Sequence, residues 1–170
     1  GAVWAECGGT LCHTLNEAPI GENFIAKALL SASGQHRVHL ESPTAVGWLR
    51  KALRTGPVVV EPWYERLADL SIHLDINEDG VREVGVTRFW AAGSGAYRGS
   101  VVGPWSAGMP PDWLRVLHGG GKGSAINAAL SMTGRRVGAE LQALGIRGPV
   151  GVDCLVVRQD GLIKFLPVLE

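Results

Sequence analysis

The chain has 170 residues, of which 46% are apolar and 19% are charged, and its 16 Lys and Arg residues balance its 16 Asp and Glu residues. This length and apolar content predict one compact domain or two small lobes with a hydrophobic core, and they exclude a disordered chain. A net charge of zero disfavours a nucleic-acid-binding surface. No apolar run approaches the roughly 20 residues of a membrane-spanning helix, so we expect neither nucleic acid nor membrane as a partner.

The first part of the chain predicts a small lobe of strands with one helix. Residues 24–30 and 36–40 are rich in strand-forming side chains and are separated by a loop that contains Ser and Gly. Ser42 and Pro43 suit the start of a helix, and the Gly56-Pro57 pair suits its end. Three consecutive valines at 58–60 predict a strand that is buried on both faces.

The rest of the chain predicts a larger, mostly antiparallel lobe. Residues 69–76 alternate between apolar and polar, residues 77–80 form a turn, and residues 81–90 return as the partner strand, with a further strand at 97–102. A long helix over residues 124–144 should turn these side chains inward: Ile126, Leu130, Val137, Leu141 and Leu144. Residues 150–157 and 162–169 predict a closing hairpin. The pattern as a whole predicts an α+β fold with two lobes, residues 1–57 and 58–170.

Lys27 lies within an apolar strand, where a buried ammonium group is costly unless an anion meets it. The strand runs into a Ser/Gly loop whose backbone N–H groups and hydroxyls suit a phosphate. Lys27 is therefore a candidate for gripping a triphosphate. The alternative is a lysine on the solvated face of an edge strand, and by itself the residue favours that alternative.

Asp153 lies within a second apolar strand, and Glu170 ends the chain. If residues 157 and 162 pair across the hairpin, both carboxylates lie on one face, because side chains alternate along a strand. That pairing leaves them roughly 13 Å apart along the strands, so a bulge or a longer loop is needed before both can hold a hard cation such as Mg²⁺. The alternative for Glu170 is a solvated terminal residue.

Several segments, taken in order, resemble the ATP-grasp superfamily, and in particular its bacterial members organised like carboxylate–amine ligases. They are Lys27 with its Ser/Gly loop, residues 58–61, residues 67–71, residues 148–153 and residues 167–170. The resemblance covers the chain from about residue 24 to its end. It implies an ATP-grasp fold, with two mixed lobes and antiparallel sheets that enclose a nucleotide cleft.

The resemblance also implies site residues, with ATP and Mg²⁺ as cofactors. Lys27 would contact the ATP phosphates, and the loop that closes over them would hold Ser31, Ser33 and Gly34. Glu61 would offer its backbone carbonyl to the adenine amino group, while an N–H group would come from Trp63 or Tyr64, because Pro62 cannot donate. Asp69 would bind the ribose hydroxyls, Asp153 and Glu170 would bind magnesium, and Arg88 and Lys164 are weaker candidates for phosphate contact.

The activity that the resemblance implies is that of an ATP-dependent ligase, which activates a small-molecule carboxylate as an acyl phosphate for attack by an amine or similar nucleophile. Members of the superfamily commonly carry a preceding domain and continue beyond Glu170 with an Asn and a substrate-side Arg. We therefore expect a partial member, or alternatively a degenerate domain that binds nucleotide or a partner without catalysis. Three cysteines, Cys7, Cys12 and Cys154, make no disulfide framework and predict a reduced, cytoplasmic protein.

Overall fold

The computed structural model describes residues 8–19, 23–29, 36–92, 97–118, 125–159 and 161–168. The chain divides into two compact units, residues 1–64 with 91–97 and residues 65–90 with 98–170. Strand β4 (Val58–Pro62) belongs to the sheet of the first unit, because it pairs with strands on both of its sides. The first unit therefore extends beyond the boundary expected at residue 57.

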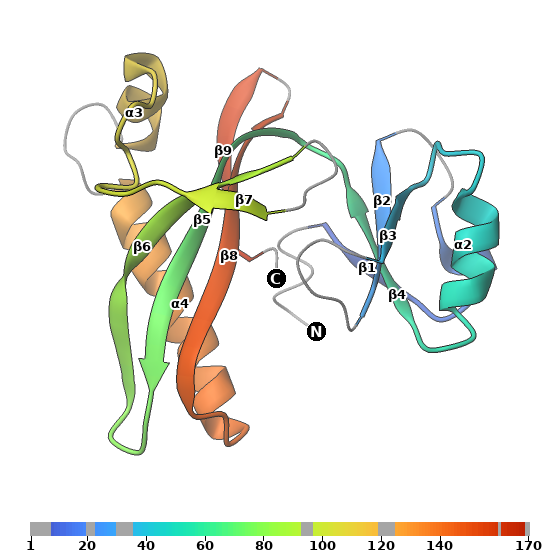
Figure 1. The fold of residues 1–170 in the computed structure, drawn as a ribbon, viewed down its shortest axis with the longest axis horizontal. Coiled ribbons are helices and arrows are strands. Elements are labelled where there is room, and N and C mark those ends of the chain that lie inside the picture. Colours follow the sequence, from blue (N-terminus) through green and yellow to red (C-terminus); the bar gives the residue numbers. More distant parts are fainter. Residues whose placement is uncertain are drawn as a thin grey trace. The chain divides into compact units, whose positions relative to one another are not determined.

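The first unit is built on a four-stranded sheet with the order β1-β4-β2-β3 (Figure 1). Its strands are β1 (Thr10–Cys12), β2 (Phe24–Ala28), β3 (Arg37–His39) and β4, and every pair is antiparallel. A 3₁₀ turn, η1 (Leu15–Glu17), follows β1, and helix α2 (Ala45–Ala52) connects β3 to β4. Helix α2 starts two residues later than Pro43, and Leu49 is buried with sheet residues Ala26, Val38 and Val60 in one core.

The second unit is built on a five-stranded sheet with the order β7-β6-β5-β8-β9. Its strands are β5 (Glu65–Ile76), β6 (Val81–Ala91), β7 (Tyr97–Ser100), β8 (Gly148–Gln159) and β9 (Leu162–Leu166). Two helices accompany the sheet, α3 (Pro111–Leu117) and α4 (Ala125–Ala143). Mixed helices and antiparallel sheets confirm the predicted α+β class.

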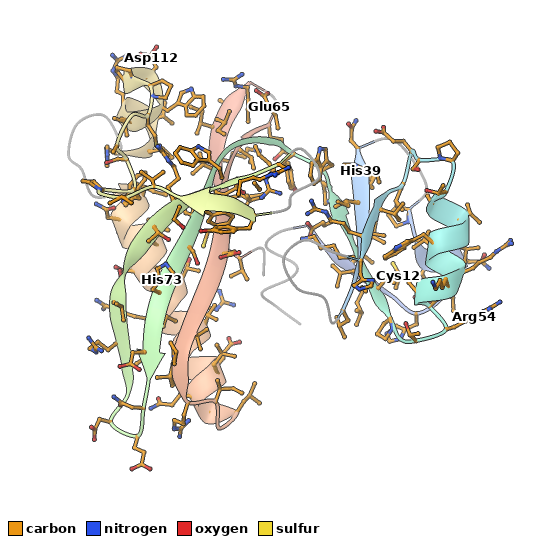
Figure 2. The ribbon with its side chains drawn as sticks, in the orientation of Figure 1. Cys12, His39, Arg54, Glu65, His73 and Asp112 are labelled. Carbon is orange, nitrogen blue, oxygen red and sulfur yellow. The ribbon has the colours of Figure 1, made fainter. Side chains whose placement is uncertain are left out.

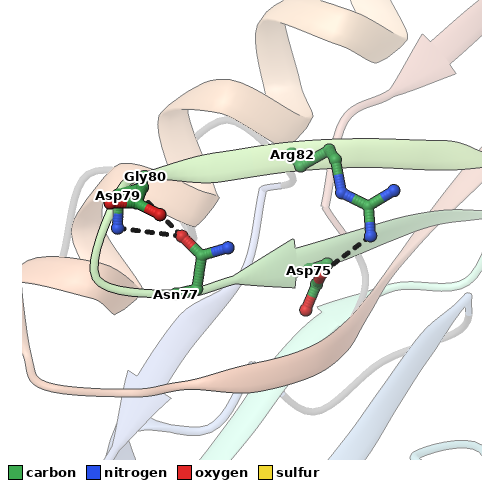
Figure 3. A network of polar contacts seen from close by, with 5 residues as sticks. All are labelled: Asp75, Asn77, Asp79, Gly80 and Arg82. Carbon is green, nitrogen blue, oxygen red and sulfur yellow. Dashed lines mark hydrogen bonds and ion pairs between the residues drawn. The ribbon is translucent and has the colours of Figure 1, made fainter.

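A side-chain network fixes the turn between β5 and β6 (Figure 3). The Asn77 Oδ1 atom accepts hydrogen bonds from the backbone N–H groups of Asp79, at 2.9 Å, and Gly80, at 3.0 Å. Gly80 has a φ of +147°, which glycine adopts without a steric penalty. Beside the turn, Arg82 forms an ion pair of 2.8 Å with Asp75. The predicted hairpin is therefore present, and its turn sets the register of β5 against β6.

Helix α4 packs along one face of the second sheet, where Ile126 and Leu130 are buried (Figure 1). The prediction for Leu144 is wrong, because the helix ends at Ala143 and the Leu144 side chain is 78% exposed. Among the described residues, no helix combines the length and the apolar character needed to cross a bilayer.

Candidate functional site

The first sheet has a core face, which packs on α2, and an opposite face that carries charge. Residues directly opposite each other on paired strands share a face. Lys27 lies opposite Arg37 on β3 and Val59 on β4, while Ile25 lies opposite His39 and Glu61. We call this set the polar face of the first sheet: Ile25, Lys27, Arg37, His39, Val59 and Glu61.

Lys27 and Glu61 form an ion pair across β2 and β4. The Lys27 Nζ atom lies 2.5 Å from Glu61 Oε1, and the two side chains are only 17% and 9% exposed. Because β2 lies between β4 and β3, Lys27 is not on an edge strand, and the solvated-edge alternative does not describe it. Glu61 is the anion that a mostly buried ammonium group requires. The phosphate contact of Lys27 stays a prediction.

The segment after β4 differs from expectation at Trp63. The Trp63 backbone N–H donates to the Asn23 carbonyl at 2.7 Å, so it is already engaged within the first unit. The choice between Trp63 and Tyr64 as the N–H donor to adenine stays a prediction. The Trp63 ring meets the His39 ring edge-on, with 4.5 Å between centroids, and lies 5.9 Å from the Arg37 Cζ atom.

Part of the expected site lies outside the described residues. The phosphate-loop residues Ser31, Ser33 and Gly34 belong to this part, as do the metal candidate Glu170 and Cys7. Their predicted roles stay predictions. No group of three or more His, Cys, Asp or Glu side chains arranged for a metal ion occurs in the described ranges.

The second sheet also has two faces, and alternation along β5 separates them. Leu70, Ile72 and Leu74 are buried in the core with α4. The intervening residues point the other way, and Ser71 lies opposite Thr87 on β6 and opposite Asp153 on β8. We call this set the polar face of the second sheet: Asp69, Ser71, His73, Thr87 and Asp153. The second sheet thus brings the predicted Asp69 and Asp153 onto one face.

Polar contacts that the sequence did not reveal hold this face together. Asp69 is only 8% exposed and forms an ion pair with Arg66, three residues earlier in β5. His73, which is labelled in Figure 2, has its Nε2 atom 2.8 Å from Thr87 Oγ1 on the neighbouring strand. The polar positions of the alternating segment were visible in the sequence, but their partners follow only from the strand register.

Burial raises the pKa of the Asp153 carboxyl above its ordinary value. A hydrogen bond from the Ser71 hydroxyl opposes this shift, the charge of Asp69 adds to it, and the charges of His73 and Arg66 oppose it. A carboxylate that is costly to ionise gains most from a bound cation. The metal-binding role of Asp153 stays a prediction.

Arg88 lies on the opposite face of the second sheet. It pairs in register with the buried Leu70, and its Nη2 atom donates to the Ala107 carbonyl at 2.6 Å. Arg88 therefore points away from Asp69 and Asp153 and ties β6 to the loop before α3. This placement disfavours the expected phosphate contact. Lys164, the other weak candidate, hydrogen-bonds to Gln159 Oε1 at 3.1 Å on the exposed end of the hairpin.

The β8–β9 hairpin is tighter than the sequence suggested. Val157 pairs with Lys164, not with Leu162, and Gln159 pairs with Leu162. The assumed pairing behind the roughly 13 Å separation of the carboxylates is therefore wrong. The Cys154 Sγ atom donates to the Pro167 carbonyl at 2.9 Å, which holds the segment after β9 close to β8.

No family model and no curated protein matches the sequence. Solved structures do match. N5-carboxyaminoimidazole synthetase from Staphylococcus aureus, complexed with ADP, has a TM-score of 0.59 and 10% identity over 99% of this chain and 43% of that chain. An ADP complex of N5-carboxyaminoimidazole ribonucleotide synthetase has a TM-score of 0.58 and 16% identity, and the match covers 99% of this chain and 43% of that chain. The chain has the ATP-grasp fold.

A further structure with the ATP-grasp fold widens the comparison. The biotin carboxylase domain of Hydrogenobacter thermophilus 2-oxoglutarate carboxylase, in complex with MgADP, ADP and bicarbonate, has a TM-score of 0.54 and 13% identity over 86% of this chain and 30% of that chain. This chain spans less than half the length of each of these structures. At these identities the similarity establishes the ATP-grasp fold, which confirms the fold that the sequence predicted.

Proposed function

We propose that the chain is the Mg-ATP-binding part of a ligase that activates a small-molecule carboxylate as an acyl phosphate for attack by an amine or similar nucleophile. One observation carries this proposal. In an ATP-grasp fold, the charged residues of otherwise apolar strands, Lys27 with Glu61 and Asp69 with Asp153, gather on the polar faces of the two sheets. Such charges are costly in a sheet unless they serve a ligand or each other.

Each proposed nucleotide contact has its own chemical reason. Lys27 supplies an ammonium group to the phosphates, together with the loop that contains Ser31, Ser33 and Gly34. The Glu61 carbonyl and an N–H group of Trp63 or Tyr64 are the backbone pair for the adenine edge. Asp69 offers a carboxylate to the ribose hydroxyls. Lys27, Glu61 and Asp69 lie on strands and form ion pairs, so their side chains have little order to gain on binding.

Asp153 and Glu170 are the proposed magnesium residues. Carboxylate oxygens are the ligands that Mg²⁺ prefers in proteins, and the ion commonly bridges protein carboxylates and phosphates. When bound, Mg²⁺ neutralises phosphate charge and so favours phosphoryl transfer. The protein's own contribution is to position the reactants and to place fixed charges near them.

The proposed substrate class rests on the comparison with the biotin carboxylase domain. The structure of the biotin carboxylase domain is a complex with bicarbonate, a carboxylate-type anion. A small-molecule carboxylate is therefore our proposal for the group that ATP activates here. We also propose a cytoplasmic location, which fits the buried Cys12 and Cys154, neither of which forms a disulfide.

Calorimetric titration with ATP, with and without Mg²⁺, tests the function. The unmodified chain should bind ATP more tightly with Mg²⁺ than without it. Lys27→Ala should weaken ATP binding by about tenfold or more. In Asp153→Asn, the ATP affinity should no longer depend on Mg²⁺. The exposed Lys51→Ala and Asp79→Asn are matched controls that should bind like the unmodified chain. Lys27→Gln, which keeps a donor for Glu61, replaces Lys27→Ala if that variant fails to fold.

Two results would count against the function. No ATP binding by the unmodified chain would overturn it. ATP binding with no effect of Mg²⁺ or of Asp153→Asn would favour the degenerate, non-catalytic domain instead.

A further inference from the structure

His73 lies in the middle of the polar face of the second sheet, and the proposed function gives it no role. Directly opposite it stand Gly85 on β6 and Gly151 on β8. Residues opposite each other on paired strands point to one face, so the half-buried His73 ring has no side chain beside it on either neighbouring strand. This row of the sheet is therefore low on both sides of the imidazole ring.

The two glycines leave different amounts of room. A Cβ atom added at Gly151 would lie 3.3 Å from Ser71 Oγ, so this glycine makes room for a hydroxyl that hydrogen-bonds to Asp153. A Cβ atom added at Gly85 would have no described atom within 4 Å beyond its chain neighbours. The register of β5 against β6 shifts beside this row, and such bulges are frequent next to active sites. Glycine within a strand also marks places where a ligand approaches the backbone closely.

Thr87 holds the His73 ring, because its Oγ1 atom lies 2.8 Å from Nε2. If Nε2 carries the proton, it donates to the hydroxyl oxygen, and the hydroxyl hydrogen is left for another acceptor. If Nδ1 carries the proton, the hydroxyl donates to Nε2, and the Nδ1–H group is left. The pair therefore keeps one hydrogen-bond donor in either tautomer, and an anionic oxygen is the acceptor that forms the strongest bond with it.

Position along β5 relates this pair to the proposed nucleotide site. Asp69, Ser71 and His73 follow one another on the polar face, roughly 7 Å apart, and Asp153 lies opposite Ser71. With Asp69 at the ribose and Asp153 at the magnesium ion, as proposed, the nucleotide would run along β5 towards His73. The next position beyond the terminal phosphate belongs to the group that receives it.

We infer that His73 and Thr87 bind the small-molecule carboxylate that ATP activates, in the space over Gly85. This inference rests on the proposed function and adds a binding site for the substrate to it. The donor of the His73–Thr87 pair contacts a carboxylate oxygen, and the rest of the substrate lies over Gly85, where no side chain obstructs it. A larger side chain at position 85 should therefore exclude the substrate.

NMR titration of the ¹⁵N-labelled chain in buffer with Mg²⁺ tests this inference. Acetate is the probe, and acetamide, which has a similar shape but no charge, is the matched control ligand. Acetate should shift the amide signals of Gly85 and Thr87, and acetamide should shift them much less. His73→Phe keeps a ring but loses both nitrogens, so it should bind acetate about tenfold more weakly. His13→Phe, at an exposed position of the first unit, should bind acetate as the unmodified chain does.

Gly85→Val is a second variant that tests the same site without removing a hydrogen bond. Its Cβ atom has room and valine favours strands, so the unfolding midpoint should not fall. The added methyl groups would fill the space beside the His73 ring. Acetate should therefore bind at least about tenfold more weakly, as followed at the Thr87 amide.

The outcomes separate this inference from the proposed function. Unchanged acetate affinity in either variant, each shown to be folded by thermal unfolding, overturns the carboxylate site, and so do equal shifts with acetate and acetamide. If the unmodified chain binds Mg-ATP but not acetate, the inference fails and the proposed function remains. If acetate binds through His73 and Mg-ATP does not bind, the carboxylate site stands and the proposed function fails. If neither binds, both fail.

Discussion

Asp69 is the residue whose proposed role can be tested most selectively. Its Oδ1 atom accepts a hydrogen bond from the Arg66 guanidinium group within the same strand. A carboxylate has two oxygens and several lone pairs, so the second oxygen can accept from a ribose hydroxyl while the ion pair persists. The Arg66 contact restrains the orientation of the Asp69 carboxylate.

We therefore predict that Asp69→Asn binds ATP about tenfold more weakly but binds 2′,3′-dideoxy-ATP almost as well as the unmodified chain does. Competition titrations with the two nucleotides measure this ratio. Asp75→Asn is the matched control, because Asp75 also pairs with an arginine, Arg82, but at the turn end of β5. Equal losses for both nucleotides in Asp69→Asn would show that Asp69 does not recognise the ribose.

Asp153 gives a prediction about pH. Because its pKa is raised in the folded chain, the folded state binds the proton more tightly than the unfolded state does. Protonation of Asp153 adds to the free energy of unfolding. This contribution is complete below the unfolded pKa of about 4, and it is lost as the pH rises through the folded pKa. At neutral pH, the raised pKa of Asp153 therefore lowers the free energy of unfolding of the metal-free chain.

Asp153→Asn cannot ionise, so it should have a higher unfolding midpoint than the unmodified chain at pH 7. This difference should shrink or disappear at about pH 3, where Asp153 is mostly protonated in both states. Thermal unfolding in buffer that contains a chelator measures both differences. A stabilisation of the same size at both pH values would contradict a role for ionisation.

At the scale of elements, α4 approaches the second sheet through glycines. A Cβ atom added at Gly138 would overlap the Val81 Cγ1 atom, whereas one added at Gly134 would lie 3.1 Å from Ile72 Cγ2 and 3.3 Å from Leu74 Cδ2. Valine is β-branched and has little rotamer freedom with which to move away. The two glycines thus differ in how much room the sheet leaves.

We predict that Gly138→Ala lowers the free energy of unfolding by about 1–2 kcal/mol, since overpacking outweighs the roughly 1 kcal/mol gained in helix propensity. Gly134→Ala should be close to neutral, because a smaller shift accommodates the new methyl group. Ala139→Gly, at an exposed position of the same helix, measures the effect of helix propensity without a change in packing against the sheet. Chemical denaturation of the variants gives the three values, and a stabilising Gly138→Ala would contradict the close approach.

Helices and strands could be predicted from the sequence where hydrophobic periodicity or turn residues gave a strong signal. Elements without either signal were not predicted. The alternation in β5, the Asn77–Gly80 turn and the long α4 were all foreseeable. Strand β1 has three residues and α3 has seven, too short for a period to stand out, so both were missed. Such short elements depend on tertiary packing, which the local sequence does not encode.

The candidate site shows a similar division. Charged residues in apolar strands, such as Lys27 and Asp153, could be singled out because their burial needs a reason. Their partners could not be, because a partner follows from the register, and β5 has irregularities against both of its neighbours. A shift of one residue turns every side chain to the other face, and the observed register places Arg88, a weaker candidate for phosphate contact, on the face away from Asp153.

At the scale of the whole molecule, we propose that the charged polar faces of the two sheets bind Mg-nucleotide. A crystal structure of the chain with ADP and Mg²⁺ tests this claim most directly. We predict a phosphate oxygen about 3 Å from Lys27 Nζ and a magnesium ion about 2.1 Å from an Asp153 carboxylate oxygen. A nucleotide bound without a phosphate contact to Lys27, or a magnesium ion held away from Asp153, would contradict it.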